Sequence, residues 1–217
     1  MNETVTVILP AYNEGPRIAG VLKALIRARK KGIVDDIIVV NDGSTDETAR
    51  EAGKFEVKLI NLKENRGKGA ALAAGIGAAK TDVILFLDAD LVGLRISHVQ
   101  KLLLPIVNNK RVGMTIGLFR KSGFVANLGN MMQLLSGQRA VRRSWVSEIA
   151  GLSEPRYGVD ALITKYARKR GVLSMRIYLD GLQHVYKEQK NNAFVGFFHD
   201  RLKMYYEILR TLIKSVE

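Results

Sequence analysis

The chain has 217 residues, 47% of them hydrophobic, no cysteine and a formal net charge of +13. A chain of this length can bury one sizeable core, so we expect a single domain over residues 1–217 rather than two. The missing cysteines exclude disulfides and thiolate metal sites. The first residues lack the pattern of a signal peptide, and no apolar run is long enough to span a bilayer. We therefore expect a cytoplasmic protein.

The positive charge is unevenly distributed along the chain. Lys and Arg balance Asp and Glu in residues 1–90, whereas the whole excess of +13 lies in residues 91–217. A basic half of this kind attracts nucleic acid, anionic lipid headgroups or a phosphorylated small acceptor. The sign of the charge does not choose among these partners, and a solvated basic surface is the simpler alternative.

Apolar, β-branched runs alternate with helical periodicities in the first 90 residues. The runs predict strands over residues 5–9, 36–41, 57–62 and from residue 84 onward. Pro10 is expected to end the first strand, because proline cannot donate in a central ladder. Apolar positions at helical spacing predict helices over residues 18–30, 47–53 and 70–79. Strands separated by helices imply a parallel, wound sheet, so the expected fold class is α/β.

The second half of the chain is less regular. Its patterns predict helices over residues 99–107 and 157–169, and strands over residues 112–119 and 172–179. Residues 120–129 are typical of a basic loop. Residues 194–217 are amphipathic at helical period and predict a C-terminal helix, which either packs on the core or docks on a membrane.

Two carboxylates stand at the end of the fourth strand. If that strand continues to Asp90, a period of two puts Asp88 and Asp90 on the same side, where both can bind a hard cation such as Mg²⁺ or Mn²⁺. The alternative is a loop with two solvated aspartates. Ligands of wound sheets bind beyond the carboxyl ends of the strands. We therefore expect a diphosphate site formed by residues 10–14, 42–46, 66–69 and 88–90.

Four motifs at these strand ends follow one another in the sequence. They are Val7-Ile8-Leu9-Pro10-Ala11-Tyr12-Asn13-Glu14, Val39-Val40-Asn41-Asp42-Gly43-Ser44-Thr45-Asp46, Asn65-Arg66-Gly67-Lys68-Gly69 and Leu87-Asp88-Ala89-Asp90. With these motifs in this order, the chain resembles family 2 glycosyltransferases of the GT-A fold. The resemblance implies a Rossmann-like, mostly parallel sheet flanked by helices. Residues 1–90 would be the nucleotide-binding half and residues 91–193 the acceptor-side half.

The resemblance also implies roles for single residues. Four residues would wall the nucleoside, the last of them toward the ribose: Pro10, Ala11, Tyr12 and Glu14. Asp42 would address the base, and Lys68 would lie near the diphosphate, where its place at a helix start also favours anion binding. Asp88 and Ala89 would touch the nucleotide, and Asp90 would bind the metal ion.

The second half carries a partial resemblance. Tyr157-Gly158-Val159-Asp160, followed later by His184, is similar to the pattern of glucosyl-3-phosphoglycerate synthases. The resemblance implies that Asp160 lines the acceptor side and that His184 is a metal ligand. If the transfer inverts the configuration of the sugar, Asp160 is the candidate base, whereas a retaining reaction or an already ionised phosphate acceptor needs none. Because guanidinium groups bind phosphate or carboxylate bidentately, three arginines are candidates for an anionic acceptor: Arg139, Arg142 and Arg143. The simpler alternatives are a helix cap, a surface histidine and a solvated arginine face.

The expected function is transfer of a sugar from a nucleoside diphosphate sugar, UDP favoured over GDP, to an anionic acceptor such as a polyprenyl phosphate or phosphoglycerate. The expected cofactor is Mg²⁺ or Mn²⁺. A nucleotidyltransferase is an alternative, but residues 10–14 lack its Gly-rich, Arg-containing phosphate loop. A nucleic-acid-binding protein is another, but the basic half has no Cys/His finger and no RNA-reading aromatic motif, so no nucleic acid is expected. Peripheral binding to the inner face of the membrane and a homodimer stay open.

Overall fold

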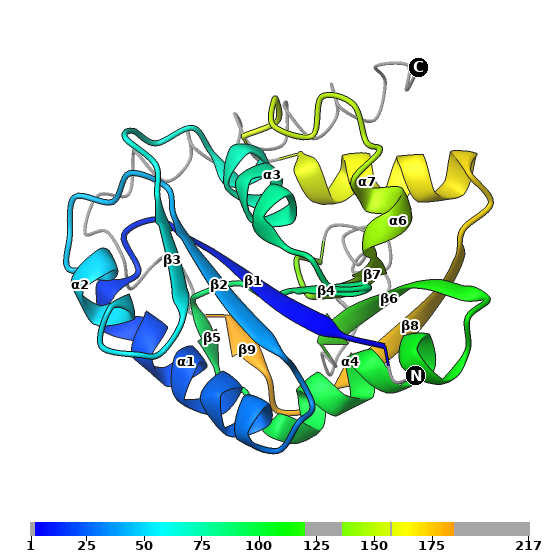
Figure 1. The fold of residues 1–217 in the computed structure, drawn as a ribbon, viewed down its shortest axis with the longest axis horizontal. Coiled ribbons are helices and arrows are strands. Elements are labelled where there is room, and N and C mark those ends of the chain that lie inside the picture. Colours follow the sequence, from blue (N-terminus) through cyan, green and yellow to red (C-terminus); the bar gives the residue numbers. More distant parts are fainter. Residues whose placement is uncertain (1–2, 120–135, 157, 185–217) are drawn as a thin grey trace, which may run out of the picture.

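The computed structural model describes residues 3–119, 136–156 and 158–184. Within these residues, a central seven-stranded sheet has the strand order β3-β2-β1-β4-β7-β6-β8 (Figure 1). Its strands are β1 Val5–Ala11, β2 Asp36–Asn41, β3 Lys58–Asn61, β4 Val83–Phe86, β6 Val112–Phe119, β7 Arg139–Arg142 and β8 Leu173–Leu179. A short second sheet pairs β5 (Leu91–Val92) with β9 (Gln183–His184).

The direction of the strands confirms the predicted wound sheet, with one exception. Strands β1 to β4 pair in parallel, and so do β6 and β8. Strand β7 runs antiparallel to both of its neighbours, β4 and β6. Strand β7 was not predicted from the sequence, because its four residues begin and end with arginine. Its direction puts Arg139 opposite Phe86, at the carboxyl end of β4.

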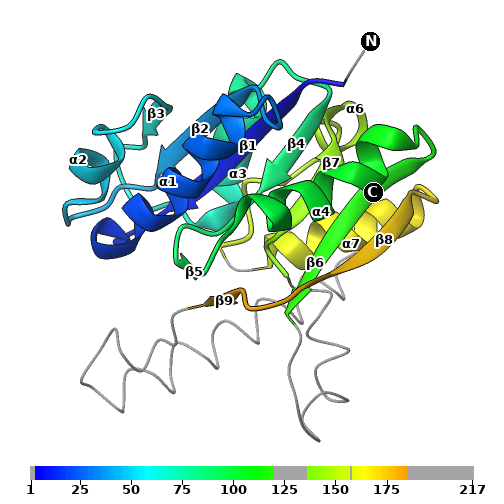
Figure 2. The ribbon, with the colours of Figure 1, turned by 90° about the horizontal axis from the view of Figure 1, so that it is seen from below.

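Helices cover both faces of the sheet (Figures 1 and 2). One face carries α1 (Gly15–Lys30), α2 (Thr48–Ala52) and α4 (Ile96–Asn108), and the other carries α3 (Lys68–Ala78), α6 (Arg143–Val146) and α7 (Val159–Lys169). Alternation along β1 explains this arrangement. Val7 and Leu9 belong to the apolar cluster of α1 and α4, whereas Ile8 belongs to that of α3 and α7. A strand that is apolar on both sides requires cover on both sides.

Pro10 does not end the first strand, contrary to the sequence expectation, and β1 continues to Ala11. The Ile8 carbonyl accepts a hydrogen bond from the Leu87 N–H at 3.2 Å, so the backbone of Ile8 faces β4. Backbone groups of alternate residues face the same neighbour, so Pro10 also faces β4. Strand β4 ends at Phe86, opposite Ile8. Pro10 therefore occupies a place where the missing N–H breaks no ladder.

Pro10 also explains why the fourth strand does not continue to Asp90, as the expected pairing of Asp88 and Asp90 on one side required. The strand ends at Phe86, and Ala89 and Asp90 lie in a turn. Without an N–H at Pro10, β1 offers no donor to continue the pairing beyond Leu87. The period of two therefore does not extend to Asp90.

The other predicted elements are found close to their expected places. The helix predicted at residues 70–79 begins earlier, at Lys68, which puts that lysine in the first turn of α3. The loop expected at residues 120–129 and the helix expected at residues 194–217 lie outside the described residues. Among the helices that the structure does describe, none combines the length and the apolar character of a membrane span.

Close packing of α3 on β1 provides a matched pair of substitutions. A Cβ on Gly75 would lie 2.5 Å from Cγ2 of the buried Ile8, whereas a Cβ on Gly77 would meet no atom within 4 Å. We expect Gly75→Ala to lower the unfolding free energy by about 1–3 kcal/mol through overpacking. Gly77→Ala should raise it by about 0.5–1 kcal/mol, because alanine restricts the unfolded chain. Urea unfolding measures both, and equal effects of the two would contradict this packing.

Candidate active site

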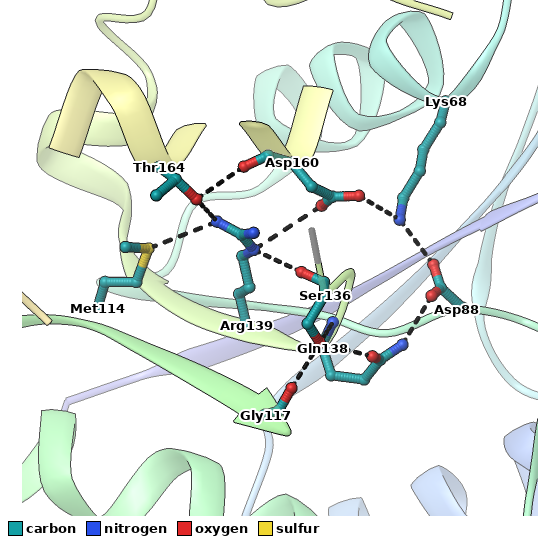
Figure 3. A network of polar contacts seen from close by, with 9 residues as sticks. All are labelled: Lys68, Asp88, Met114, Gly117, Ser136, Gln138, Arg139, Asp160 and Thr164. Atoms are coloured by element: carbon teal, nitrogen blue, oxygen red, sulfur yellow. Dashed lines mark hydrogen bonds and ion pairs between the residues drawn. The ribbon is translucent and has the colours of Figure 1, made fainter. Parts of the chain in front are cut away.

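The carboxyl end of β4 meets α3 and α7 in a network of polar contacts (Figure 3). The Lys68 ammonium lies 2.8 Å from Asp88 Oδ1 and 3.0 Å from Asp160 Oδ2. Lys68 begins α3, Asp88 follows β4, and Asp160 lies in the first turn of α7. The fold thus brings together three residues that the sequence analysis selected for donor and acceptor roles.

The charge of Lys68 is secured by its partners. Burial alone would lower the pKa of the Lys68 ammonium, but the carboxylates of Asp160 and Asp88 outweigh burial and raise its pKa above the ordinary value. Lys68 therefore remains a cation at neutral pH. Its side chain is 23% exposed, so solvent and ligands can reach it. A compact cation at the carboxyl edge of the sheet suits a phosphate oxygen.

A short segment before β7 holds Asp88 from the other side. Gln138 Nε2 donates to Asp88 Oδ2 at 2.7 Å, and Gln138 has no exposed surface. The Ser136 hydroxyl lies 2.9 Å from Gln138 Oε1 and 2.5 Å from the Gly117 carbonyl oxygen. The sequence analysis missed both Ser136 and Gln138. Their position next to the arginine cluster was the one signal that could have drawn attention to them.

Arg139 is fully buried in the same segment. Its guanidinium donates to the Ser136 carbonyl at 2.6 Å and to Thr164 Oγ1 at 2.7 Å, and its Nε lies 3.8 Å from Asp160 Oδ1. Burial lowers the pKa of Arg139, and the carboxylates of Asp160 and Asp88 oppose that shift. The guanidinium expected to meet an acceptor is thus placed against α7 and its Asp160 (Figure 3).

One carboxylate oxygen of Asp160 lacks a hydrogen bond. Oδ2 is paired with Lys68, whereas Oδ1 is buried and accepts no hydrogen bond from any described residue. A buried polar atom in this state points to a ligand that supplies the missing contact. The alternative role of Asp160 as a helix cap does not apply, because the residue that caps α7 is Gly158 and no side chain bonds there.

The other two arginines of the predicted cluster lie at the opposite edge of the sheet. Arg142 ends β7 at the amino end of β4, whereas Arg139 begins it at the carboxyl end. The Arg142 guanidinium donates to the Glu3 carboxylate at 2.6 Å, and Arg143 Nε donates to the Thr81 carbonyl at 2.8 Å. The expectation of one acceptor-binding arginine cluster is therefore corrected. An extended strand separates residues that the sequence places close together.

Asp42 shapes the loop that precedes α3. Its carboxylate accepts from the backbone N–H groups of Arg66 at 2.8 Å and Gly67 at 2.7 Å, and from Asn65 Nδ2 at 3.0 Å. Asp42 is almost fully buried, and burial raises its pKa although these hydrogen bonds act in the opposite direction. The structure thus places Asp42 at the predicted edge of the sheet, with both carboxylate oxygens bonded to this loop.

A neighbouring loop closes the amino end of α3. The backbone N–H of Lys68 donates to the Arg156 carbonyl at 3.1 Å, and that of Gly69 to the Pro155 carbonyl at 3.2 Å. A Cβ on Gly69 would lie 2.4 Å from the Pro155 oxygen, so a residue without a side chain is needed there. These two N–H groups at the start of α3 are therefore occupied by carbonyl oxygens, whereas the side chain of Lys68 is partly exposed.

The turn after β1 is locked to the turn after β2. Asn13 has a positive φ of 54°, which asparagine tolerates, and its side-chain oxygen accepts from the Thr45 N–H at 3.0 Å. The Asp46 carboxylate accepts from the N–H groups of Gly15 at 3.0 Å and Thr48 at 2.9 Å. Burial alone would raise the pKa of Asp46, but its hydrogen bonds outweigh burial and lower it. The two turns therefore form one rigid unit.

The predicted nucleoside wall lies on this unit. Pro10 and Ala11 are the last residues of β1, and Tyr12 follows them with 45% of its surface exposed. Glu14 is largely buried, and its carboxylate lies 3.2 Å from the Arg17 guanidinium. An exposed aromatic ring beside a rigid turn is suited to stacking on a flat base.

The predicted metal ligands are brought to neighbouring backbone positions. Asp90 directly precedes β5, and the pairing of β5 with β9 puts Leu91 opposite His184. Ala89 is buried between the partly exposed Asp88 and Asp90. Across the ranges that the structure describes, no three His, Cys, Asp or Glu side chains form a ready metal-binding group. The donors on the loop after β4 are carboxylate oxygens, which Mg²⁺ and Mn²⁺ prefer.

Comparison with known families identifies the family of the chain. The model of the family described as Glycosyl transferase family 2 matches residues 6–153, more than half of the chain. The chain belongs to this family. Membership confirms the family expected from the sequence and favours a glycosyltransferase over the nucleotidyltransferase and nucleic-acid-binding alternatives.

Curated members of family 2 match parts of the chain. Over 125 residues, the chain is 34% identical to a glucosyl-3-phosphoglycerate synthase of Mycolicibacterium smegmatis, covering 54% of this chain and 41% of the relative. Over 107 residues it is 36% identical to a 4,4'-diaponeurosporenoate glycosyltransferase of Staphylococcus aureus, covering 47% and 28%. The matches therefore span less than half the length of these relatives.

Two solved structures share the fold over nearly the whole chain. Mannosyl-3-phosphoglycerate synthase from Rubrobacter xylanophilus superposes with a TM-score of 0.79 at 21% identity, covering 97% of this chain and 72% of that one. Glucosyl-3-phosphoglycerate synthase from Mycobacterium tuberculosis, in complex with Mg²⁺ and UDP, gives 0.77 at 24% identity, covering 97% and 78%. These likenesses confirm the GT-A type fold predicted from the sequence.

Proposed function

We propose that this chain transfers a sugar from a nucleoside diphosphate sugar to an acceptor oxygen. The observation that carries the proposal is the Lys68 ammonium held between Asp88 and Asp160, with a buried Asp160 oxygen that no described residue hydrogen-bonds. In such a transfer the departing diphosphate gains negative charge and the acceptor hydroxyl loses a proton. A fixed cation beside a carboxylate with spare acceptor capacity serves both needs.

The donor would lie across the carboxyl ends of β1, β2 and β4. Tyr12 would stack on the base, and Glu14 and Asp88 would accept from ribose hydroxyls. Asp42, which hydrogen-bonds the loop of residues 65–67, would contact the base. We favour UDP over GDP, which is supported by structural relatives that were crystallised with UDP.

The residues at this edge fit a divalent cation. Asp88 and Asp90 supply carboxylate oxygens on the loop after β4, and β9 brings the backbone of His184 beside Leu91. We propose Asp90 and His184 as ligands of Mg²⁺ or Mn²⁺, the ions named with structural relatives. When bound, the cation supplies Lewis-acid charge at the diphosphate.

Asp160 would act as the base of an inverting transfer. The bond from the anomeric carbon to the diphosphate oxygen breaks, a bond from that carbon to the acceptor oxygen forms, and the acceptor proton passes to the Asp160 carboxylate. Lys68 would contact the departing diphosphate, and its contact with Oδ2 would hold the Asp160 carboxylate in place. Arg139, buried against α7, would position Asp160 rather than touch the acceptor.

The acceptor would be an anionic molecule such as phosphoglycerate or a polyprenyl phosphate. The whole net charge of +13 lies in residues 91–217, and a structural relative was crystallised with UDP-glucose and phosphoglyceric acid. Transfer assays with phosphoglycerate, a short-chain polyprenyl phosphate and glycerol separate the alternatives. The proposal of an anionic acceptor fails if glycerol is used with the same kcat/KM as either phosphate.

Nucleotide binding provides the direct test of the donor site. We expect UDP with Mn²⁺ to raise the Tm by several degrees, because a ligand at 100 times its Kd stabilises the folded state by about 2.7 kcal/mol. Thermal unfolding with UDP or GDP, each with and without Mn²⁺, measures the preference for base and metal.

Two variants complete this experiment. Asp90→Ala should lose the part of the shift that depends on Mn²⁺, whereas Asp36→Ala should keep it. Asp36 is an exposed carboxylate at the amino end of β2, on the far edge of the sheet. A donor site at the carboxyl edge is ruled out if neither nucleotide changes the Tm of the native protein, or if both variants respond alike.

A further inference from the structure

Asp88 is held at both of its carboxylate oxygens. Lys68 Nζ lies 2.8 Å from Oδ1, and Gln138 Nε2 donates to Oδ2 at 2.7 Å (Figure 3). We propose that Gln138 is a positioning residue, which fixes the Asp88 carboxylate in the orientation that binds the donor nucleotide. This inference rests on the proposed function, and Gln138 acts through Asp88 without touching the donor.

Only one orientation of the Gln138 amide is compatible with its contact to Asp88. An ionised carboxylate only accepts hydrogen bonds, so the amide NH₂ must face Asp88 and the amide oxygen must face away from it. That oxygen lies 2.9 Å from the Ser136 hydroxyl, whose single proton also has the Gly117 carbonyl oxygen within reach at 2.5 Å. The side chain is completely buried, so water does not compete for either contact. The hydrogen bond to Asp88 therefore fixes which way the amide faces, and the buried Gln138 side chain in turn restrains Asp88.

The backbone at Gly137 packs closely against the ion pair of Lys68 and Asp88. A Cβ on Gly137 would lie 2.4 Å from Lys68 Nζ and 2.6 Å from Asp88 Oδ2. The chain can pass so close to the pair because residue 137 has no side chain. Since β7 runs antiparallel to β4, its first residues and not its last lie at the carboxyl edge of the sheet. The segment is therefore built to reach Asp88.

The Gln138 amide is an uncharged hydrogen-bond donor. It restrains Asp88 without cancelling the carboxylate charge, which the nucleotide site needs for ribose hydroxyls or for a cation's hydration shell. Without Gln138, the carboxylate could rotate and offer both oxygens to Lys68. Each of these two groups would then be less available to the nucleotide.

The test is steady-state kinetics of Gln138→Met, which keeps the length of the side chain and removes its donor. We expect the KM for the nucleotide sugar to rise roughly ten-fold or more, because a hydrogen bond to a charged group is lost. The KM for the acceptor should stay within about two-fold. General loosening of the fold would not single out the donor KM. Gln100→Met, at an exposed position of α4, is the matched control and should behave as the native enzyme.

A second variant keeps the inference testable if Gln138→Met does not fold. Ser136→Ala removes the hydroxyl that lies between the Gln138 amide and the Gly117 carbonyl, and it should raise the donor KM in the same direction by a smaller factor. Unchanged donor KM values in the folded variants, with native Mn²⁺-dependent UDP binding, would overturn the role of Gln138 alone. If the native protein itself bound no nucleotide in the thermal experiment, the proposed function and this inference would fall together.

Discussion

Replacing Asp160 by Asn is expected to lower the kcat of sugar transfer by about 10²–10⁴-fold, the usual contribution of a general base. Asparagine keeps the size of the side chain and an oxygen for the Lys68 ammonium, which now lies 3.0 Å from Asp160 Oδ2. It cannot take a proton from the acceptor hydroxyl. Measurement of kcat with saturating donor and acceptor gives the effect.

The control for Asp160→Asn separates chemistry from binding. The variant should bind UDP and Mn²⁺ as the native protein does, and the exposed substitution Asp36→Asn should leave kcat unchanged. A kcat within a few-fold of native would show that no base at position 160 is needed. That is the expected outcome for an acceptor that reacts through an already ionised phosphate oxygen.

Replacing Lys68 by Met should impair both turnover and stability. Loss of the cation beside the diphosphate is expected to lower kcat/KM by about 10²–10³-fold. Breaking a buried ion pair costs about 3–5 kcal/mol, and because Lys68 is 23% exposed we expect a loss of about 1–3 kcal/mol of unfolding free energy. The loss arises because Asp88 and Asp160 then face each other without a cation between them.

The acid dependence of this loss identifies its cause. Protonation of a carboxyl group removes the repulsion, so the stability gap between native protein and Lys68→Met should be smaller at pH 4 than at pH 8. Urea unfolding at the two pH values measures it. Lys30→Met, which removes an exposed cation at the end of α1, should show no such gap. An equal gap at both pH values would mean that Lys68 stabilises the fold by packing alone.

The nucleotide-binding half was predictable because its signals are local. Most strands of this half are short apolar runs, and a polar cluster follows each strand in the chain. Parallel pairing then carries the ends of β1, β2 and β4 to one edge, so Asp42, Lys68 and Asp88 were correctly expected there. Asp160 could not be placed beside Lys68 in this way, because the two residues are 92 positions apart in the chain. It was selected only through the resemblance to a known family.

The errors arise where contacts between distant segments decide the outcome. Arg139 and Arg142 look alike in the sequence, but the antiparallel pairing of β7 sends them to opposite edges of the sheet. The backbone N–H groups at the start of α3 look available until the carbonyls of Pro155 and Arg156 occupy them. Gln138 lies in no motif, and its burial against Asp88 follows from the order of strands β4, β7 and β6.

Pro10 marks the boundary between two kinds of backbone. Strands β1 and β4 are paired in parallel up to Ile8 and Phe86, and the chain after Phe86 is no longer part of the sheet. A residue with an N–H at position 10 could donate to the Leu87 carbonyl and lengthen the sheet, which would draw Asp88 into the pleat and away from Lys68. The proline thus keeps Asp88 outside the sheet, where Lys68 and Gln138 can hold its carboxylate.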